Sequence, residues 1–556
     1  MKRSDIKNTY LSKEIMKTFV CKWKNFFILN LSLGIFSYFM MISLQLINQL
    51  DGIWHSGFGG AGNWERSIGR YLLPYWDELR FGLLTDPFCN VLALVFFILG
   101  NIFVLECLKI GPDKFIAYGF SLIFLISTSV GAWLSFRYAS NMFAIAYFTS
   151  VLAVFVSSSN LKGVKSIDIK ALKSKGIEVE PLSIVLGAVC VMVSLATYQA
   201  FMNCTCMLIL ATVLVMILRG SEICEIAIVF IKNAISIVIG AIFYFSGLQI
   251  CFTIRDLGMG EYNEVESLSV WDMIVSIPES SGKALYYFRK YFFDTMFRWN
   301  RLQEHSIFKV LFFGLLLVTF IVAMIVIWKN NKVNAIVFAL CVLIMPIATN
   351  AVLFIARDSF LSIQMTCGLA FFVAICMVIV FEVFEAVDWN KILGDKKALK
   401  KIVNVAITAF CILIIYGNYI SVQIDQEACR EGRTGTITIA GEVLDTLLEM
   451  GHIDVGGTVC FVGMPCGNER FMYTEIYPMA NNLMQFGNWG TTASSHKQTW
   501  EAIYREYFGY YIQACDEKDF DEIIERGDVQ LMPCFPRQGS IMKLGDITVV
   551  KISNIY

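Results

Sequence analysis

An aspartate and several arginines next to apolar segments are the residues most able to carry chemistry in this chain. Asp51 directly follows the first long apolar stretch, where a carboxylate could act as a general base on a hydroxyl group. Arg66 and Arg70 are four residues apart, so on a helix both guanidinium groups would share one face and could grip a phosphate. The alternatives are a solvated helix end for Asp51 and interfacial snorkelling for the two arginines.

Two further arginines stand in very short segments between apolar stretches. Arg137 lies in the run SFRYASN, and Arg357 lies in the run ARDS. Each is interpreted either as an anchor at the membrane interface or as part of a site for an anion. For Arg357 a local pair with Asp358 is a third interpretation.

Residues of several kinds near these charges are candidates for substrate binding. Trp54 and Tyr198 offer rings that could stack on a sugar, and Gln199 could bond to a sugar hydroxyl. Glu65 and Asp77 are further acids in the segment that holds Asp51. For Tyr198, anchoring at the membrane interface is an equally good explanation.

The composition predicts a protein with many membrane spans. Of the 556 residues, 56% are apolar and only 16% are charged, and the mean hydropathy is +0.61. A soluble protein of this length needs more charged residues to cover its domains. The sequence therefore excludes soluble, disordered and disulfide-rich classes and predicts an all-α polytopic membrane protein.

About eleven stretches are long and apolar enough to cross a bilayer, which needs roughly 20 such residues. Lysines gather before the first stretch and in alternate connections, so the positive-inside rule predicts a cytoplasmic N-terminus and an outer C-terminus. The expected location is the cell membrane. The predicted spans are 25–47, 87–108, 115–134, 142–159, 182–200, 203–218, 234–254, 307–328, 333–355, 365–387 and 402–424.

The expected organisation has three parts. Residues 1–24 form a basic cytoplasmic N-terminus, and residues 25–424 form the polytopic domain. Residues 425–556 form a small outer α/β domain. Two large outer loops, about 48–86 and 255–306, complete the outer face, where we expect any chemistry to take place.

The tail mixes helical and strand patterns. Helical spacing covers 440–450, 499–511 and 519–526, whereas Thr458–Val462 and Ile547–Ile552 are apolar, β-branched runs typical of buried strands. Strands alternating with helices favour a small α/β domain.

The sequence predicts neither a metal site nor a cofactor. The four histidines, His55, His305, His452 and His496, are scattered without metal-ligand spacing. Most of the 17 cysteines lie in apolar spans, and the disulfide state of the five in the tail is left open.

Several short motifs together resemble a known family. The chain is similar to the GT-C class of membrane glycosyltransferases and, more narrowly, to the bacterial Gtr type II glucosyltransferases that modify O-antigen. That family tends to have adjacent acids in the first loop, whereas here Gly52 follows Asp51. The motifs that carry the resemblance are Asp51 with Trp54, WERSIGRYL at 64–72, FRYASNMFAIA at 136–146, SLATYQAF at 194–201 and the run at 532–553.

The resemblance implies transfer of a hexose, expected to be glucose, from a polyprenyl-phosphate carrier to a cell-surface polysaccharide on the outer leaflet, with inversion. Asp51 would be the base, and Arg66, Arg70 or Arg137 would hold the donor phosphate. An upstream polyprenyl-phosphate glucosyltransferase and a flippase are the implied partners, and no nucleic acid is expected.

A transporter or flippase of lipid-linked glycans is the main alternative. Such a protein should carry charges along a pathway inside its spans. Here Glu106, Glu382 and Glu385 are expected at inner span ends, and the span centres are almost free of charge. An acyltransferase is a third interpretation, with His55 as its only candidate residue.

Overall fold

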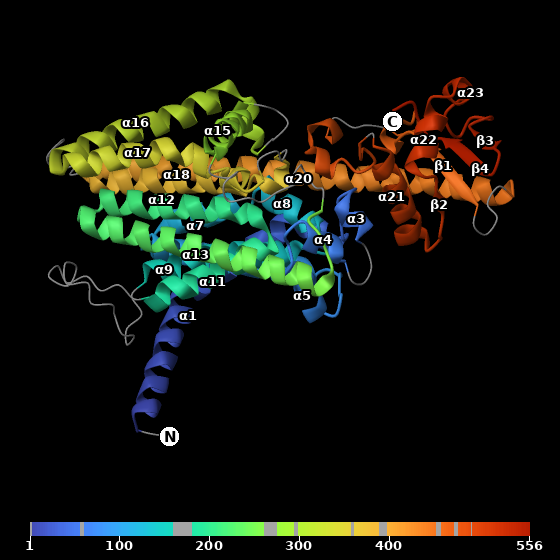
Figure 1. Cartoon of the computed structure of the whole chain (residues 1–556). Helices are drawn as coiled ribbons and strands as arrows, with labels where there is room; N and C mark the ends of the chain where they lie inside the picture. Colours follow the sequence, from blue (N-terminus) through green and yellow to red (C-terminus); the bar gives the residue numbers. More distant parts are fainter. Residues whose placement is uncertain are drawn as a thin grey trace.

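The computed structural model describes residues 3–55, 60–159, 181–260, 275–293, 299–356, 361–387, 397–451, 457–471, 476–490 and 492–555. It consists of a helical bundle joined to a small domain with a sheet (Figure 1). The expected fold class, mostly helical with a small C-terminal α/β domain, is therefore confirmed in its broad outline.

The bundle is built from helices that match the predicted apolar stretches. The first loop carries three short helices, α3 (Asp51–Trp54), α4 (Asn63–Ser67) and α5 (Leu73–Leu79), and the second large loop carries α15 (Ile277–Phe293). The bundle helices are α1 (Arg3–Ser37), α2 (Phe39–Ser43), α6 (Phe88–Cys107), α7 (Phe115–Leu125), α8 (Thr128–Ser135), α9 (Ser140–Ser158), α11 (Pro181–Thr197), α12 (Met202–Leu218), α13 (Ile223–Arg255), α16 (Ser306–Asn330), α17 (Lys332–Ala348), α18 (Cys367–Ala386) and α20 (Lys397–Glu449).

In the described part of the chain, seven helices are long and apolar enough to cross a membrane. The number rises to eight if α7 and α8, which meet at a 47° bend, form one broken span. The helices α1, α11 and α17 overlap predicted spans but fall outside this set. Each predicted stretch thus overlaps a helix, whereas the number of eleven spans stays a prediction.

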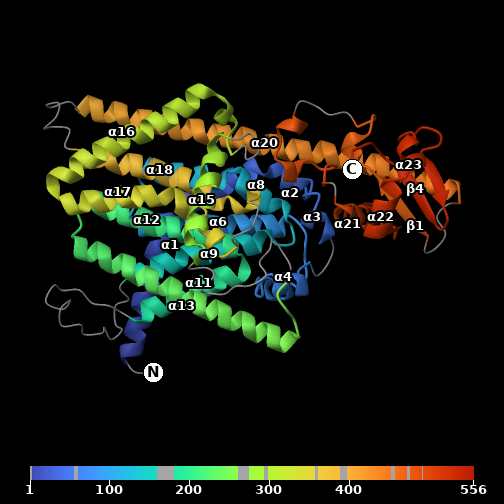
Figure 2. The ribbon, with the colours of Figure 1, turned by 45° about the horizontal axis from the view of Figure 1, so that its top comes forward.

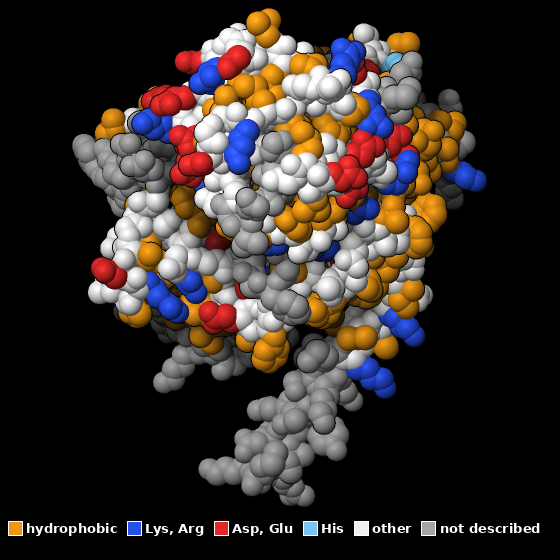
Figure 3. All heavy atoms as spheres, turned by 90° about the vertical axis from the view of Figure 1, so that its right-hand side faces the viewer, with side chains coloured by type: hydrophobic (Ala, Val, Ile, Leu, Met, Phe, Trp, Pro, Cys, Tyr) orange, Lys and Arg blue, Asp and Glu red, His pale blue; other side chains and the backbone are white. Residues whose placement is uncertain are grey.

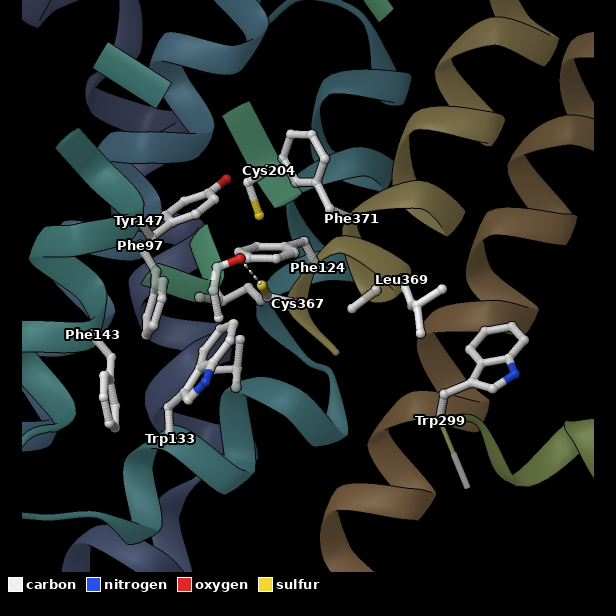
Figure 4. Packing of buried hydrophobic residues seen from close by; sticks show 14 of the residues in the cluster. Phe97, Phe124, Trp133, Phe143, Tyr147, Cys204, Trp299, Cys367, Leu369 and Phe371 are labelled. Carbon is white, nitrogen blue, oxygen red and sulfur yellow. Dashed lines mark hydrogen bonds between the residues drawn. The ribbon is translucent and has the colours of Figure 1, made fainter. Parts of the chain in front are cut away.

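Aromatic side chains pack together inside the bundle around Trp133 of α8 (Figure 4). Phe124 stacks on Tyr147 with ring centroids 4.7 Å apart, and Trp133 of α8 lies 5.3 Å from Phe97 and 4.9 Å from Phe201. The Trp133 indole N–H donates to the backbone oxygen of Gln364 at 2.8 Å. This packing anchors α8, whose outer end supports the first loop.

One long helix connects the bundle to the tail. Helix α20 has 53 residues and runs past residue 425, where the tail was expected to begin (Figures 1 and 2). Gln426 in its middle donates to the Ser37 oxygen at 2.9 Å and accepts from the Met41 N–H at 2.8 Å. The end of α1 is thereby attached to α20 at the level where both leave the bundle.

The tail contains a four-stranded sheet in the order β2-β1-β4-β3. Strand β1 (Thr458–Val462) pairs in parallel with β2 (Gln513–Ala514) and β4 (Ile547–Lys551), whereas β3 (Ile541–Leu544) is antiparallel to β4. The strands predicted at 458–462 and 547–552 correspond to β1 and β4. The helices of the tail are α21 (Ala493–Ile503), α22 (Glu517–Ile524) and α23 (Gly527–Leu531).

Short single turns complete the described elements. In the bundle these are η1 (Gln199–Phe201), η2 (Arg301–Glu304), η3 (Ala351–Phe354) and η4 (Ile363–Met365). In the tail they are η5 (Pro465–Gly467), η6 (Tyr477–Met479), η7 (Asn482–Met484) and the π-helical turn η8 (Tyr504–Phe508).

The tail packs so closely on α20 that only glycine fits at Gly432. A Cβ atom at that position would lie 2.1 Å from the backbone oxygen of Phe486. We expect Gly432→Ala to destabilise the packing of the tail by about 1–3 kcal/mol, as overpacking typically does. The measurement is the thermal unfolding midpoint of the purified protein, together with protease sensitivity of the tail.

Gly441→Ala in the same helix is the matched control. Its added Cβ would meet only the edge of the Phe508 ring at 3.3 Å, which a small ring movement relieves. Equal effects of the two substitutions would contradict the steric explanation.

Candidate functional site

Asp51 is held at the start of α3 by the side chain of Asn48. The Asn48 oxygen accepts from the backbone N–H groups of Leu50 at 3.1 Å and Gly52 at 3.0 Å. Its amide nitrogen donates to the Ser135 hydroxyl at 3.2 Å, at the end of α8. Asn48 therefore fixes the first loop to the anchored helix α8 and orients the turn that presents Asp51.

The same contacts explain why glycine follows Asp51. A Cβ atom at Gly52 would lie 2.8 Å from both the Asn48 amide nitrogen and the Ser135 backbone oxygen. The family tends to have a second acid in the first loop, but an acidic side chain has no space at position 52 in this chain. Asp51 is the acid that this turn can present.

Charged groups from the first loop surround Asp51. Burial raises the pKa of the Asp51 carboxyl above its ordinary value, and the positive charges of His55 and Arg70 oppose this rise, whereas Glu65 adds to it. Burial, followed by the charges of Asp51 and Glu65, raises the pKa of the Tyr138 hydroxyl well above its ordinary value. A carboxylate with a raised pKa is a stronger base than a solvated one.

His55 connects Asp51 to the rest of the loop. Its ring stacks on Tyr138 with centroids 4.4 Å apart, and Nδ1 contacts the backbone oxygen of Gly60. Nε2 lies 3.7 Å from the Glu65 carboxylate, so both ring nitrogens face acceptor oxygens, an arrangement that suits the positively charged ring. Glu65 is buried and also accepts from the Gly62 N–H at 2.6 Å.

Arg70 points toward the cluster, while Arg66 points away from it. The Arg70 guanidinium lies over the Tyr198 ring, 4.8 Å from its centroid. Arg66 instead approaches the exposed Glu78 at 3.7 Å and lies 5.5 Å from the centroid of the Tyr75 ring. The charge of Arg70 acts on the Asp51 carboxyl, whereas Arg66 contacts other residues of the first loop.

The expectation that Arg66 and Arg70 share a helical face is wrong. Helix α4 ends at Ser67, and Gly69 has a φ of +85°, which turns the chain. A Cβ atom at Gly69 would lie 2.3 Å from the Tyr244 hydroxyl, so close packing against α13 requires this glycine. A spacing of four residues gives a common face only within a continuous helix. Because the chain turns at Gly69, the two arginines lie in different environments.

Tyr198 and Gln199 lie beside Arg70, as the sequence suggested for a common site. Gln199 Nε2 donates to the backbone oxygen of Ile68 at 3.1 Å and contacts the Tyr244 hydroxyl at 3.2 Å. These bonds attach the end of α11 to the first loop. The amide of Gln199 thus serves the loop fold in this structure.

Asp77 is engaged in a buried ion pair. Its carboxylate accepts from Arg80 Nε at 2.7 Å and from the Ala61 N–H at 2.6 Å. Arg80 also donates to Asn141 at 3.0 Å and to the backbone oxygen of Tyr138. Because all of these groups shape the loop around Tyr138, the structure gives Asp77 a supporting position.

The remaining predicted residues face the tail or lie outside the described residues. Arg137 donates to Gln45 at 3.0 Å and lies 3.4 Å from Glu506 of the tail. The Trp54 indole donates to the Thr499 hydroxyl of α21 at 2.9 Å. Arg357 lies outside the described residues.

Asn48, Tyr138 and Arg80 are site residues that sequence reasoning missed. An asparagine that binds backbone N–H groups two and four residues onward is typical of a turn, and the run before Asp51 could have suggested it. Tyr138 stands beside Arg137 in an already noted motif. For Arg80, the only indication in the sequence was its position three residues after Asp77, which allows an ion pair on a helix.

No cluster of three or more metal-ligating side chains occurs among the residues that the structure describes. The described site contains the Asp51 carboxylate, the ionisable side chains of His55 and Glu65, and the Arg70 guanidinium. This combination suits proton transfer beside an anionic group.

Comparison with known proteins identifies the family. The family model for glucosyl transferase GtrII matches residues 55–375, which is more than half of the chain. The chain belongs to the GtrII glucosyltransferase family. It is therefore a glycosyltransferase, and the expected family is confirmed. The comparisons with curated proteins and with solved structures give no match.

The Asp77 pair predicts a stability effect that a substrate contact would not produce. Asp77→Ala leaves Arg80 buried without its carboxylate partner, and such losses typically cost about 3–5 kcal/mol. We expect a clearly lower thermal unfolding midpoint for the purified variant. Glu78→Ala is the control, because the Glu78 side chain is 64% exposed and its loss should change stability by about 0.5 kcal/mol or less. An unchanged midpoint for Asp77→Ala would return Asp77 to the substrate-binding candidates.

Proposed function

We propose that this glucosyltransferase takes its hexose, expected to be glucose, from a polyprenyl-phosphate carrier. It transfers the sugar to a cell-surface polysaccharide on the outer leaflet, with inversion at the anomeric carbon. The observation that carries the proposal is that Arg70, whose guanidinium lies over the Tyr198 ring, is close enough for its charge to lower the pKa of the Asp51 carboxyl. Family membership accounts for the glucosyl transfer, and the site geometry supports the donor class.

An apolar groove supports a lipid-linked donor. A cavity of about 660 Å³ lies between α12, α13 and α17 and is lined by aliphatic, aromatic, methionine and cysteine side chains. Met202, Phe354 and Ile355 line one end of it. Met202 directly follows Gln199–Phe201, the turn beside Arg70. An isoprenoid chain in this groove would have its phosphate near the Arg70 guanidinium.

The reaction assigns separate tasks to Asp51 and Arg70. Asp51 accepts the proton of the acceptor hydroxyl group. At the same time the oxygen of that hydroxyl group forms a bond to the anomeric carbon of the donor sugar. The bond between that carbon and the phosphate oxygen breaks, and its electron pair stays on the polyprenyl phosphate. Arg70 stabilises the negative charge that grows on this leaving group.

Asp51→Asn is the direct test of the base. The amide keeps the size of the side chain but cannot accept a proton, so transfer should fall by roughly 10²–10⁴-fold. The assay supplies radiolabelled polyprenyl-phosphate glucose and bacterial surface glycans to the purified protein, with UDP-glucose as the donor control. Glu78→Gln, an exposed acid of the same loop, should retain full activity. Full activity of Asp51→Asn would move the base to another acid.

The same assay separates the transferase from a flippase. Label should reach the glycan from the lipid donor and not from UDP-glucose. Movement of intact labelled lipid between leaflets without transfer would contradict the proposal and favour the transporter interpretation.

The charges around Asp51 predict a shift in the pH profile. A general base works when deprotonated, so activity falls as the pH drops through its pKa. Glu65 raises the pKa of Asp51, and therefore Glu65→Gln should move the acidic limb of kcat/KM to lower pH. His55→Gln removes a charge that lowers this pKa and should move the limb to higher pH. Profiles that coincide with that of the unchanged protein would exclude Asp51 as the titrating group.

A further inference from the structure

A second cavity lies between the tail and the first loop. It has a volume of about 340 Å³ and is formed by three chain segments, 49–50, 361–364 and 481–490. Leu50 forms part of its wall, and Asp51 is the next residue along the chain. Since consecutive Cα atoms are about 3.8 Å apart, the cavity wall ends one residue before the proposed base, which is not itself a lining residue.

The chemistry of the cavity wall is neutral and rich in hydrogen-bonding groups. The described lining residues include no charged side chain, and the amide-bearing ones are Gln49, Gln364, Asn481, Asn482 and Asn488. Each amide both donates and accepts, as sugar hydroxyl groups do. Ser362 and Trp489 lie among them. A phosphate or a charged headgroup would find no cation among these residues, whereas a neutral sugar finds matching partners.

Most of this wall is already held in place by the protein. Gln49 Nε2 donates to the backbone oxygens of Asn482 at 2.9 Å and Asn488 at 2.6 Å. Asp425 of α20 accepts from the Asn481 N–H at 2.9 Å and from its side-chain amide at 2.6 Å. Such bonds prepare a binding site before the ligand arrives, which lowers the entropy lost on binding.

Two amide oxygens in the wall lack donors. Asp425 takes the amide nitrogen of Asn481, so the orientation of that side chain is fixed, and its oxygen accepts no hydrogen bond in the described structure. The buried Gln364 side-chain oxygen likewise accepts none from any described residue. Because neither oxygen is exposed to solvent, a ligand hydroxyl in the cavity would reach them only after a movement of these side chains.

The space-filling view looks onto this end of the molecule (Figure 3). Acidic and basic side chains are interspersed over the tail, while hydrophobic side chains gather along the flank. An uncharged, amide-lined cavity next to Asp51 therefore differs from the surface around it.

We propose that this amide-lined cavity is the acceptor subsite, which binds one or two neutral sugar units of the acceptor glycan and presents a hydroxyl group to Asp51. This assignment rests on the proposed function, in which the surface glycan is the acceptor of the transferred sugar. Its own content is that neutral sugars bind between Gln49, Ser362 and the 481–490 segment, in a cavity that shares no lining residue with the apolar groove.

Two substitutions test the subsite. Asn482→Ala removes an exposed amide from the wall, and Ser362→Trp fills the space with an indole. Gln530→Ala is the matched control, since it also removes an exposed amide from the tail but lies in α23, away from the cavity. All three side chains are at least partly exposed, so the variants are expected to fold.

The measurement has two independent readouts. The first is equilibrium binding of the purified protein to an array of bacterial surface-polysaccharide fragments, with no donor present. The second is transfer from polyprenyl-phosphate glucose, with KM determined separately for donor and acceptor. We expect Asn482→Ala to weaken fragment binding and raise the acceptor KM about tenfold, and Ser362→Trp to abolish both, with the donor KM unchanged in each. Gln530→Ala should match the unchanged protein.

The outcomes separate this proposal from the function on which it rests. Fragment binding that both cavity variants retain would overturn the subsite, even if transfer proceeds. Absence of fragment binding by the unchanged protein, while it still transfers glucose, would also overturn it. Fragment binding that is lost in the variants, without any transfer from the lipid donor, would support the subsite and contradict the proposed donor.

Discussion

The hydrogen bonds of Asn48 fix the only acid that its turn can present, and the outer structure is arranged around them. Asn48 joins the first loop to Ser135 at the end of α8, and α8 is anchored by the aromatic packing of Trp133. If this attachment shifted, Asp51 would lose its position relative to Arg70. The base that we propose would need such a fixed position relative to donor and acceptor, because small displacements of reacting groups are costly.

The electrostatic setting of Asp51 is a balance between burial and charge. Burial favours the protonated carboxyl, and the cations of His55 and Arg70 favour the carboxylate. The negative charge of Glu65 adds to the effect of burial and favours the protonated carboxyl. The result is a partly exposed carboxylate that forms no direct ion pair with any described residue.

Hydrophobic patterning made the helices and two of the four strands predictable, because periodicity records which faces are buried. Thr458–Val462 matches β1, and the predicted strand at 547–552 matches β4. The two-residue strand β2 is too short to leave a pattern. The sequence also indicated that Asp51 and Arg70 deserved attention, since charges are rare near apolar spans.

Contacts between distant segments were beyond sequence reasoning. The chain turns at Gly69, where φ is +85°, between Arg66 and Arg70, and the Tyr244 hydroxyl from α13 leaves no space there for a side chain. Likewise, Arg137 looked like an anion-binding residue because it stood alone in sequence. Its partner Glu506 lies far along the chain and could be found only from the fold.

The length of α20 has a consequence for which part of a glycan can react. Asp425, which holds the wall of the amide-lined cavity, lies directly beyond the predicted span at 402–424. From Asp425 to Glu449 the helix extends for roughly 35 Å more, at about 1.5 Å per residue. The predicted span therefore puts the cavity close to the bilayer, with the rest of the tail extending beyond it. A membrane-anchored polysaccharide, the kind of acceptor that we propose, would then be modified near its anchored end, while its growing length extends past the tail without obstructing the site.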